Sequence, residues 1–423
     1  MMVDHQALSR CQAATSDHRF GPWLPNFTSL ASPEALDPAA AAQTGTDGDA
    51  AHGDHRHAVT GVATEAQLDE VGGAIEALTN DRRITIGTQI THATKPENQV
   101  LSVRWDALHA NLFVGNDSTA ADSLRAYPFS AAIPGVFSAP VVATTGAIDS
   151  SQLSVRPGGA HVAVAHAQAP RFAVYPWSGT AWSARITPAP ALPGTGTGLS
   201  TAWRPDGAFV AFGRGPNAGN PEVIVFPFDG ATLGTPITLA ATGNFANGLA
   251  WSPDGAYLFV AWITGSTFRV TAHAFDGVTL GAAIEPVSKP DGVVNDVAVS
   301  PDGNWVAIAT EDSGHKLWVY PWSAGVFGTP VKRATPLGNR LAWAPDMAYI
   351  GLAGSIGTGA PVLAVLDFFP ASGAFGAQRT FTVTGGASVG FDVTFSADGA
   401  YAAGGYNGSV RFGAFPGTRL FGF

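Results

Sequence analysis

The sequence predicts an all-β fold, and three observations lead to this prediction. First, only 13% of the 423 residues are charged, whereas 51 are glycine and 30 are proline, a composition that disfavours long solvated helices and favours turns. Second, the stretch LAWSPDGAYLFVAW at residues 249–262 places a Pro-Asp-Gly turn between two apolar runs. Third, related stretches recur along the chain at a nearly constant spacing. The expected fold is a seven-bladed β-propeller that is closed by an N-terminal strand and preceded by an extended N-terminal arm and a short helix.

Seven copies of the turn-centred motif predict the seven blades. The copies begin at Ser102, Ser154, Ala202, Ala250, Ala298, Ala342 and Thr394. The turn proline, or the residue aligned with it, falls at Trp105, Pro157, Pro205, Pro253, Pro301, Pro345 and Ala397. Successive copies are therefore 52, 48, 48, 48, 44 and 52 residues apart, a period typical of four-stranded propeller blades.

Each copy is expected to supply the two inner strands of a blade. Proline presets the backbone at the first central turn position, and glycine accepts the left-handed conformation that closes a short hairpin. A second motif, such as VFPFDGATLGTPITL from Val225, follows six of the hairpins and predicts a third strand, a turn and a fourth strand. Its prolines should lie where the third strand ends or bulges, because proline cannot donate a hydrogen bond to a neighbouring strand. They are Pro128, Pro176, Pro227 and Pro321.

The last copy lacks a fourth strand, and an upstream segment is predicted to supply it. The final motif, GAFPGTRLFGF from Gly413, stops before any fourth strand. The segment DRRITIGTQITH at residues 81–92 resembles the fourth strand AQRTFTVTGG at residues 377–386. We expect the strand with Ile84 and Ile86 to pair with the last blade and cover its exposed edge, so that the propeller domain spans residues 84–423.

The Pro-Asp-Gly hairpins resemble those of the seven-bladed β-propeller superfamily that includes WD-repeat-like and TolB-like domains. The chain lacks the Gly-His and Trp-Asp dipeptides of true WD repeats at their usual positions, which weakens the interpretation as a eukaryotic scaffold. The resemblance implies a fold and leaves the function open.

Residues 1–63 are predicted to form an extended, low-complexity anchoring arm. The segment TGTDGDAAHGDHRHAVTG from Thr44 resembles the Asp-His-x-His segments of bacteriophage tail fibres and other virion appendages, with Ala58 where proline is common. The resemblance implies a virion protein whose arm binds other virion proteins. The apolar anchoring candidates are Phe20, Trp23, Leu24 and Phe27.

Two histidines of the arm are candidate metal ligands. His55 and His57 alternate along the chain, so on an extended strand both would project from one face, and three chains could offer six imidazoles to one metal ion. The alternative is that these histidines hydrogen-bond within a turn or to a partner chain. No resident cofactor is expected.

Residues 64–83 predict a short helix or coiled coil. Thr64 and Gln67 fit a capping box. An apolar stripe of two heptads follows, formed by Leu68, Val71, Ile75 and Leu78. Gly72 and Gly73 weaken the helix, so both a homotrimeric coiled coil and a helix docked on another surface stay open.

The inner strands also carry candidate binding residues for the central channel. Asn247, Asn295 and Asn339 occupy equivalent positions near one mouth, with Asp296 and Asp392 as neighbours in register. The other blades place Gln99, Ser151, Leu199 and Phe391 there. Such a ring could bind a cation or a sugar, and the alternative is a set of solvated polar residues. Trp182 and Trp262 break the repeat pattern and are expected to be exposed for sugar stacking, whereas His161 and His166 are expected to pack or hydrogen-bond.

The sequence contains no convincing catalytic motif, and its composition excludes several function classes. The formal net charge of −10 disfavours nucleic acid and anionic membranes, and the single Cys11 excludes an intrachain disulfide framework. The first 20 residues lack the apolar segment of a secretory signal, and no apolar run is long enough to insert into a membrane.

We therefore expect a non-enzymatic phage virion structural protein, assembled in the host cytoplasm and localised to the virion. It would be a tail or neck fibre or a receptor-binding appendage, anchored to other virion proteins by its arm, and its propeller would bind a host surface glycan or protein. Three alternatives stay open: a capsid decoration protein, a non-viral bacterial propeller scaffold and a propeller hydrolase with a channel site.

Overall fold

A computed structural model describes residues 100–414, and all of them belong to the unit Ile84–Phe423. Ten short gaps interrupt this range, at residues 107–109, 118–122, 131–135, 146–149, 217–218, 264–268, 336–337, 355–360, 383–389 and 407–408. The predicted arm, helix and closing strand lie outside the described residues. No helix in the described part of the chain is long and apolar enough to cross a membrane.

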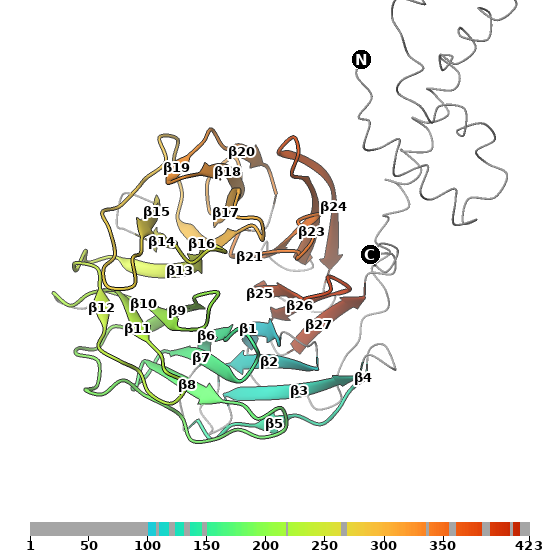
Figure 1. Ribbon diagram of the computed structural model, residues 1–423. Helices are drawn as coiled ribbons and strands as arrows, with labels where there is room; N and C mark the ends of the chain where they lie inside the picture. Colours follow the sequence, from blue (N-terminus) through green and yellow to red (C-terminus); the bar gives the residue numbers. More distant parts are fainter. Residues whose placement is uncertain are drawn as a thin grey trace, which may run out of the picture. The chain divides into compact units, whose positions relative to one another are not determined.

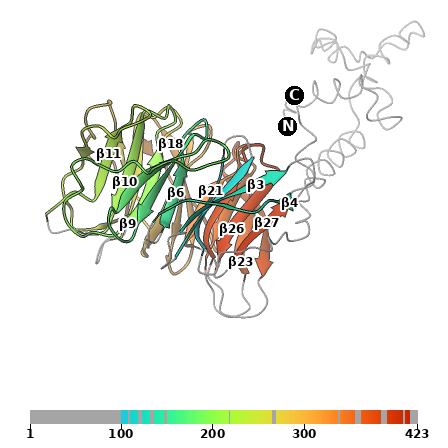
Figure 2. The same ribbon diagram turned by 90° about the horizontal axis from the view of Figure 1, so that it is seen from below.

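The described residues form antiparallel sheets arranged around a common centre (Figure 1). The innermost strands are β1 (Val100–Trp105), β6 (Ser150–Val155), β9 (Gly198–Trp203), β13 (Phe245–Trp251), β16 (Val294–Val299), β21 (Arg340–Trp343) and β25 (Gly390–Phe395). Each innermost strand contacts the innermost strands before and after it in this order, and β25 contacts β1. The strands run between the two faces of the ring, as the view turned by 90° shows (Figure 2).

Two further strands complete the inner part of every sheet, and each pairs antiparallel with its predecessor. The second strands are β2 (Asn111–Asn116), β7 (His161–His166), β10 (Phe209–Arg214), β14 (Tyr257–Ile263), β17 (Trp305–Thr310), β22 (Tyr349–Ala353) and β26 (Tyr401–Tyr406). The third strands are β3 (Leu124–Ser130), β8 (Phe172–Pro176), β11 (Val223–Pro227), β15 (Arg269–Ala274), β18 (Leu317–Ser323), β23 (Pro361–Phe369) and β27 (Ser409–Ala414).

Six of these sheets have an outer, fourth-strand element. The outer strands are β4 (Val136–Phe137), β5 (Val141–Val142), β12 (Ile237–Thr238), β19 (Val326–Phe327), β20 (Val331–Arg333) and β24 (Ala374–Thr382). In two sheets the element is an isolated bridge, Val174 to Ile186 and Ala272 to Ile284. The sheet of β25, β26 and β27 has three strands among the described residues. The all-β propeller is confirmed, with six complete blades in the described part of the chain rather than the seven that the repeat count predicts.

The Pro-Asp-Gly hairpins have the turn geometry that the sequence predicts. In the hairpin between β13 and β14, the Gly255 N–H donates to the Ser252 carbonyl at 2.8 Å, and Gly255 has a φ of 69°. Asp254 Oδ1 accepts hydrogen bonds from the Ala256 N–H at 2.9 Å and from Ser252 Oγ at 2.5 Å. These bonds close the turn and hold the two inner strands in register.

The core lies between neighbouring sheets rather than within one sheet. One cluster joins Phe259 and Val270 of one blade to Val306 and Trp318 of the next, all 3% exposed or less. The same arrangement repeats around the ring, which explains why the second strand of each blade is almost continuously buried.

The third-strand prolines lie where the strand changes or loses its outer partner. Pro176 and Pro227 end β8 and β11, as predicted. Pro321 lies inside β18, between the segment that pairs with β20 and the segment that pairs with β19. Pro128 takes the same place in β3, between the segments that pair with β5 and β4. The missing proline N–H therefore falls where no outer strand needs it.

The first repeat was aligned two residues out of register. Trp105 pairs with Leu112 in the same way that Trp203 pairs with Val210 and Trp251 pairs with Leu258. Trp105 is therefore equivalent to these tryptophans and not to the turn prolines. The cause is the missing signature, because residues 106–110 read DALHA and contain no Pro-Asp-Gly turn.

The two tryptophans that were expected to be exposed are not. Trp262 is 2% exposed, and its Nε1 donates to Thr271 Oγ1 at 2.8 Å. Trp182 is half-buried and packs against Trp177 with ring centroids 4.6 Å apart. Trp262 is therefore part of the core, and Trp182 packs at its margin with its Nε1 donating to the Val141 carbonyl at 3.0 Å, so neither is the exposed ring that was expected.

Candidate functional site

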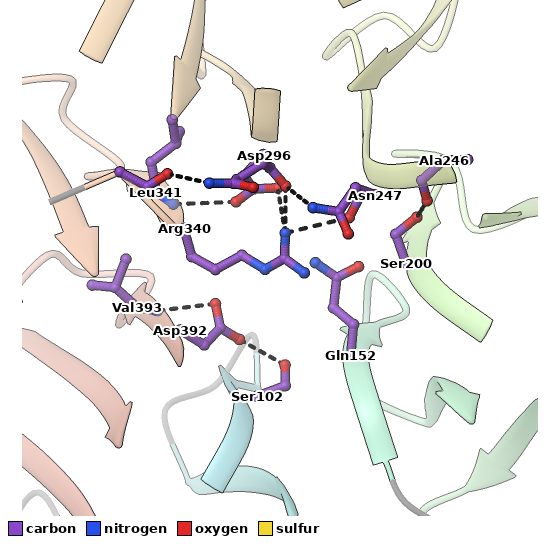
Figure 3. A network of polar contacts seen from close by, with 12 residues as sticks. Ser102, Gln152, Ser200, Ala246, Asn247, Asp296, Arg340, Leu341, Asp392 and Val393 are labelled. Atoms are coloured by element: carbon purple, nitrogen blue, oxygen red, sulfur yellow. Dashed lines mark hydrogen bonds and ion pairs between the residues drawn. The ribbon is translucent and has the colours of Figure 1, made fainter. Parts of the chain in front are cut away.

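A ring of polar side chains lines the inner strands and is the candidate site. Six inner strands have a register shift near their start, and the residue after each shift occupies the same place in every blade. We call the polar residues at this place the central network. Its members are Ser102, Gln152, Ser200, Asp296, Arg340 and Asp392, and Gly248 takes the place in the remaining strand. Figure 3 shows these side chains at close range.

Asp392 joins the last described blade to the first. Its Oδ2 accepts hydrogen bonds from Ser102 Oγ at 2.6 Å and from the Val103 N–H at 3.0 Å. Arg104 Nη1 also lies 2.5 Å from this oxygen. Because Asp392 is only 1% exposed, its charge is compensated by these donors rather than by water.

Asp296 has the equivalent role between β16 and β21. Its Oδ2 accepts a hydrogen bond from the Leu341 N–H at 3.1 Å, and its Oδ1 lies 4.0 Å from Arg340 Nη1. Burial raises the pKa of the Asp296 carboxyl, and the Arg340 charge opposes this shift. Asp296 therefore holds two blades together through one oxygen, while its charge is only partly compensated.

Neutral members of the central network make the same kind of bond. Ser102 Oγ accepts from the Leu153 N–H at 3.1 Å, and Gln152 Oε1 accepts from the Thr201 N–H at 2.8 Å. Ser200 differs, because its Oγ donates to the Ala246 carbonyl at 2.8 Å. In each case the side chain reaches the inner strand of the next blade.

The predicted asparagines lie immediately before the central network. Asn247 and Asn295 occupy the register shifts of β13 and β16, and Asn339 directly precedes β21. Asn247 Nδ2 donates to the Asn295 carbonyl at 2.9 Å, and Asn295 Nδ2 donates to the Gly338 carbonyl at the same distance. The structure thus brings Asn247 and Asn295 together, with their amide groups engaged between blades.

A second layer of inter-blade hydrogen bonds lies further along the inner strands. The indole Nε1 atoms of Trp203, Trp251 and Trp343 donate to carbonyl oxygens of the preceding blade, at 3.1, 3.1 and 3.2 Å. The acceptors belong to Ser154, Ala202 and Ala298. Burial of these tryptophans as core residues was predicted from their repeated positions and is confirmed.

Three histidines are buried in the described residues, His161 and His166 on β7 and His273 on β15, where its ring nitrogens lie 2.9 Å from Thr271 Oγ1 and from the Gly281 carbonyl. His166 is fully buried, and its Nε2 lies 3.2 Å from Tyr175 Oη. His161 is 9% exposed, and burial lowers its pKa. His161 and His166 pack or hydrogen-bond, as predicted.

The hydrogen bonds of the central network connect neighbouring blades. Among the described residues, Ser102 Oγ donates to the Asp392 carboxylate and accepts from the Leu153 N–H, so both of its bonds connect neighbouring blades. Within the described residues, no group of three His, Cys, Asp or Glu side chains could hold a metal ion. The metal candidates His55 and His57 and the anchoring candidates Phe20, Trp23, Leu24 and Phe27 lie outside the described residues.

Sequence reasoning missed four members of the central network, which are Ser102, Gln152, Ser200 and Arg340. An alignment of NDV, NRL and FDV at the starts of β16, β21 and β25 places Asp296, Arg340 and Asp392 at one position. These opposite charges at equivalent positions of successive repeats could have identified Arg340 from the sequence.

Comparison with known proteins supports the repeat architecture. Residues 286–318 match the family model described as WD domain, G-beta repeat. The match covers β16, β17 and the beginning of β18, which belong to one blade. No curated protein matches the chain. Together with the fold, the match indicates a WD-repeat-like propeller.

Proposed function

We propose that this protein is a non-enzymatic binding protein whose propeller is a rigid platform for contacts with other macromolecules. The observation that carries this proposal is the use of the central polar residues. Asp392, Ser102 and Gln152 direct their oxygen atoms to the next blade, so these groups stabilise the ring instead of forming a reactive constellation. Binding would then fall to the loops that connect the strands.

In its specific form, the proposal is that the protein is a structural component of a phage virion. Residues 1–63 would anchor it to other virion proteins, and the propeller would bind a host surface glycan or protein. The support is the Asp-His-x-His resemblance at residues 54–57 and the apolar side chains earlier in the same segment. A tail or neck position is preferred over capsid decoration because the resemblance is to fibres and appendages.

Co-sedimentation with purified candidate virions tests this function. Full-length protein should sediment with the particles, whereas protein that lacks residues 1–63 should stay in the supernatant and keep its circular dichroism spectrum. If neither protein sediments, the virion proposal fails and the bacterial scaffold becomes the preferred interpretation. If both sediment equally, the propeller rather than the arm makes the contact.

We further propose a seven-bladed ring in which residues 81–92 form the fourth strand of the last blade. Six sheets have a fourth-strand element and the sheet of β25 to β27 has three described strands, so one outer place requires a strand. Ile84 and Ile86 would supply its buried side chains.

Two deletions distinguish this closure from a free edge. Removal of residues 81–92 should lower the melting temperature and speed amide hydrogen exchange in β27 (Ser409–Ala414). Removal of residues 1–63 is the matched control and should change neither quantity. Unchanged exchange in β27 after the first deletion would show that residues 81–92 do not pair there.

A further inference from the structure

The guanidinium of Arg340 is held in place by one of its nitrogen atoms. Nη1 donates to the Asn295 carbonyl at 2.5 Å and lies 3.3 Å from the Asn247 carbonyl. These contacts connect β21 to β16 and β13. They leave the edge formed by Nε and Nη2 without a hydrogen-bond partner among the described residues. A planar guanidinium that is fixed at one corner presents this edge in a defined direction.

Gln152 presents a second unused donor group from the other side of the ring. Its Oε1 accepts the Thr201 N–H, which orients the amide, and its Nε2 has no hydrogen-bond partner within the described chain. The residue is only 4% exposed. Figure 3 shows the Gln152 amide and the Arg340 guanidinium pointing toward each other across the centre of the ring.

The hydrogen bonds of the nearby carboxylates go to groups other than these donors. Asp392 Oδ2 is bonded to Ser102, Val103 and Arg104 on the adjacent side of the ring. Asp296 Oδ1 lies close to Gly248 of β13. A Cβ atom at position 248 would be only 2.8 Å from this oxygen. The unpartnered donor atoms of Arg340 and Gln152 are not among the fully buried ones, so they reach solvent and are available to a guest that accepts hydrogen bonds.

We propose that the centre of the ring binds a small oxoanion between the Nε and Nη2 edge of Arg340 and the Nε2 of Gln152. A guanidinium edge and an oxoanion form two parallel hydrogen bonds, and the Gln152 amide would bond a third oxygen. This site is independent of the proposed macromolecular contacts. Sulfate, phosphate and a small carboxylate share the required chemistry.

Selenate is a suitable probe because it resembles sulfate and scatters X-rays anomalously. Crystals of the full chain soaked in selenate should show an anomalous peak between Arg340 and Gln152. Titration calorimetry with selenate, phosphate and acetate in a chloride buffer then identifies the preferred oxoanion in solution. A water molecule at this place in the soaked crystals, together with no heat of binding for any of the three probes, would overturn the proposal.

Variants connect the binding to these two side chains. Gln152→Glu keeps the acceptor for Thr201 but removes the amide donors, and Arg340→Gln removes the guanidinium edge. Each should weaken binding by about tenfold or more, because each loses hydrogen bonds to a charged group. Arg379→Gln is the matched control, since Arg379 lies in the same blade as Arg340 and pairs with Asp367 at 2.5 Å. If all three variants bind selenate equally, the oxoanion lies elsewhere. If one variant fails to fold, the other and the wild-type crystals still decide the outcome.

Discussion

Replacement of Asp392 by asparagine tests whether the central network holds the ring together. Asparagine preserves the shape of the side chain, but its amino group cannot accept the hydrogen bonds that Asp392 Oδ2 receives from Ser102, Val103 and Arg104. The single amide oxygen can face only one side, so either the Val103 N–H or the Val393 N–H, which Asp392 Oδ1 accepts at 2.9 Å, would stay buried without a partner, which costs about 1–3 kcal/mol. Loss of the buried charge pair brings the expected destabilisation to about 3–5 kcal/mol.

The expected change in melting temperature follows from the size of the unit. Its 340 residues, Ile84–Phe423, would have an entropy of unfolding of about 0.7 kcal/mol/K if each contributes about 2.1 cal/mol/K. A loss of about 4 kcal/mol then lowers the melting temperature by about 6 °C. Differential scanning fluorimetry and urea titration both measure this effect.

Asp206→Asn is the matched control, because the Asp206 side chain is 47% exposed and pairs with Arg204 at the surface. Surface pairs contribute about 0–1 kcal/mol, so this variant should melt within about 1 °C of the wild type. The effect of Asp392→Asn should persist in 0.5 M salt, because buried charges are screened weakly. Equal shifts for the two variants would refute the idea that Asp392 fastens the last described blade to the first.

Three further predictions address packing, hydrogen bonding and pH. Trp251→Phe keeps an aromatic ring but loses the bond from Nε1 to the Ala202 carbonyl, so urea titration should show a loss of about 1–3 kcal/mol; an unchanged midpoint contradicts the role of that bond. Gly213→Ala would place a Cβ against Ser200 Oγ, so scanning fluorimetry should show a destabilisation of about 1–3 kcal/mol, and a neutral result means that the inner strands can separate there at little cost. Burial lowers the pKa of His273 below 6.5, so the stability that depends on its neutral form is fully present above pH 6.5 and is lost as the pH falls through the folded-state pKa. Melting curves between pH 7.5 and 5 should therefore show a steeper decline for the wild type than for His273→Gln, and parallel curves contradict this assignment.

The propeller could be predicted because its turns and strands have strong local signals. The Pro-Asp-Gly sequence fixes a hairpin without help from distant residues, and its repetition at a period near 48 residues predicts the blades. The register of the first repeat could not be read in the same way. There the hairpin lacks the turn sequence, and the pairing of Trp105 with Leu112 in the folded protein shows its place.

The central network was predicted only in part because it depends on distant contacts. The asparagine spacing led to the neighbouring Asp296 and Asp392, but a register shift in six of the inner strands decides which following side chain meets the next blade. Trp262 shows the opposite problem. Its place outside the repeated pattern suggested exposure, whereas a single hydroxyl, Thr271 Oγ1, satisfies its indole in the interior.

The side chains at the central position differ from blade to blade, although the backbone repeats. Serine, glutamine, serine, glycine, aspartate, arginine and aspartate succeed one another; the serines, the glutamine and the aspartates bond to the strand that follows, whereas Arg340 bonds to earlier strands. The blades are therefore not interchangeable parts. If the coding segments of two blades were exchanged, a carboxylate such as Asp296 would meet a neighbour without its arginine. The hydrogen bonds of the central side chains thus depend on the order of the repeats. In a ring of identical repeats, the same central side chain would have to find its hydrogen-bond partners in an identical neighbour.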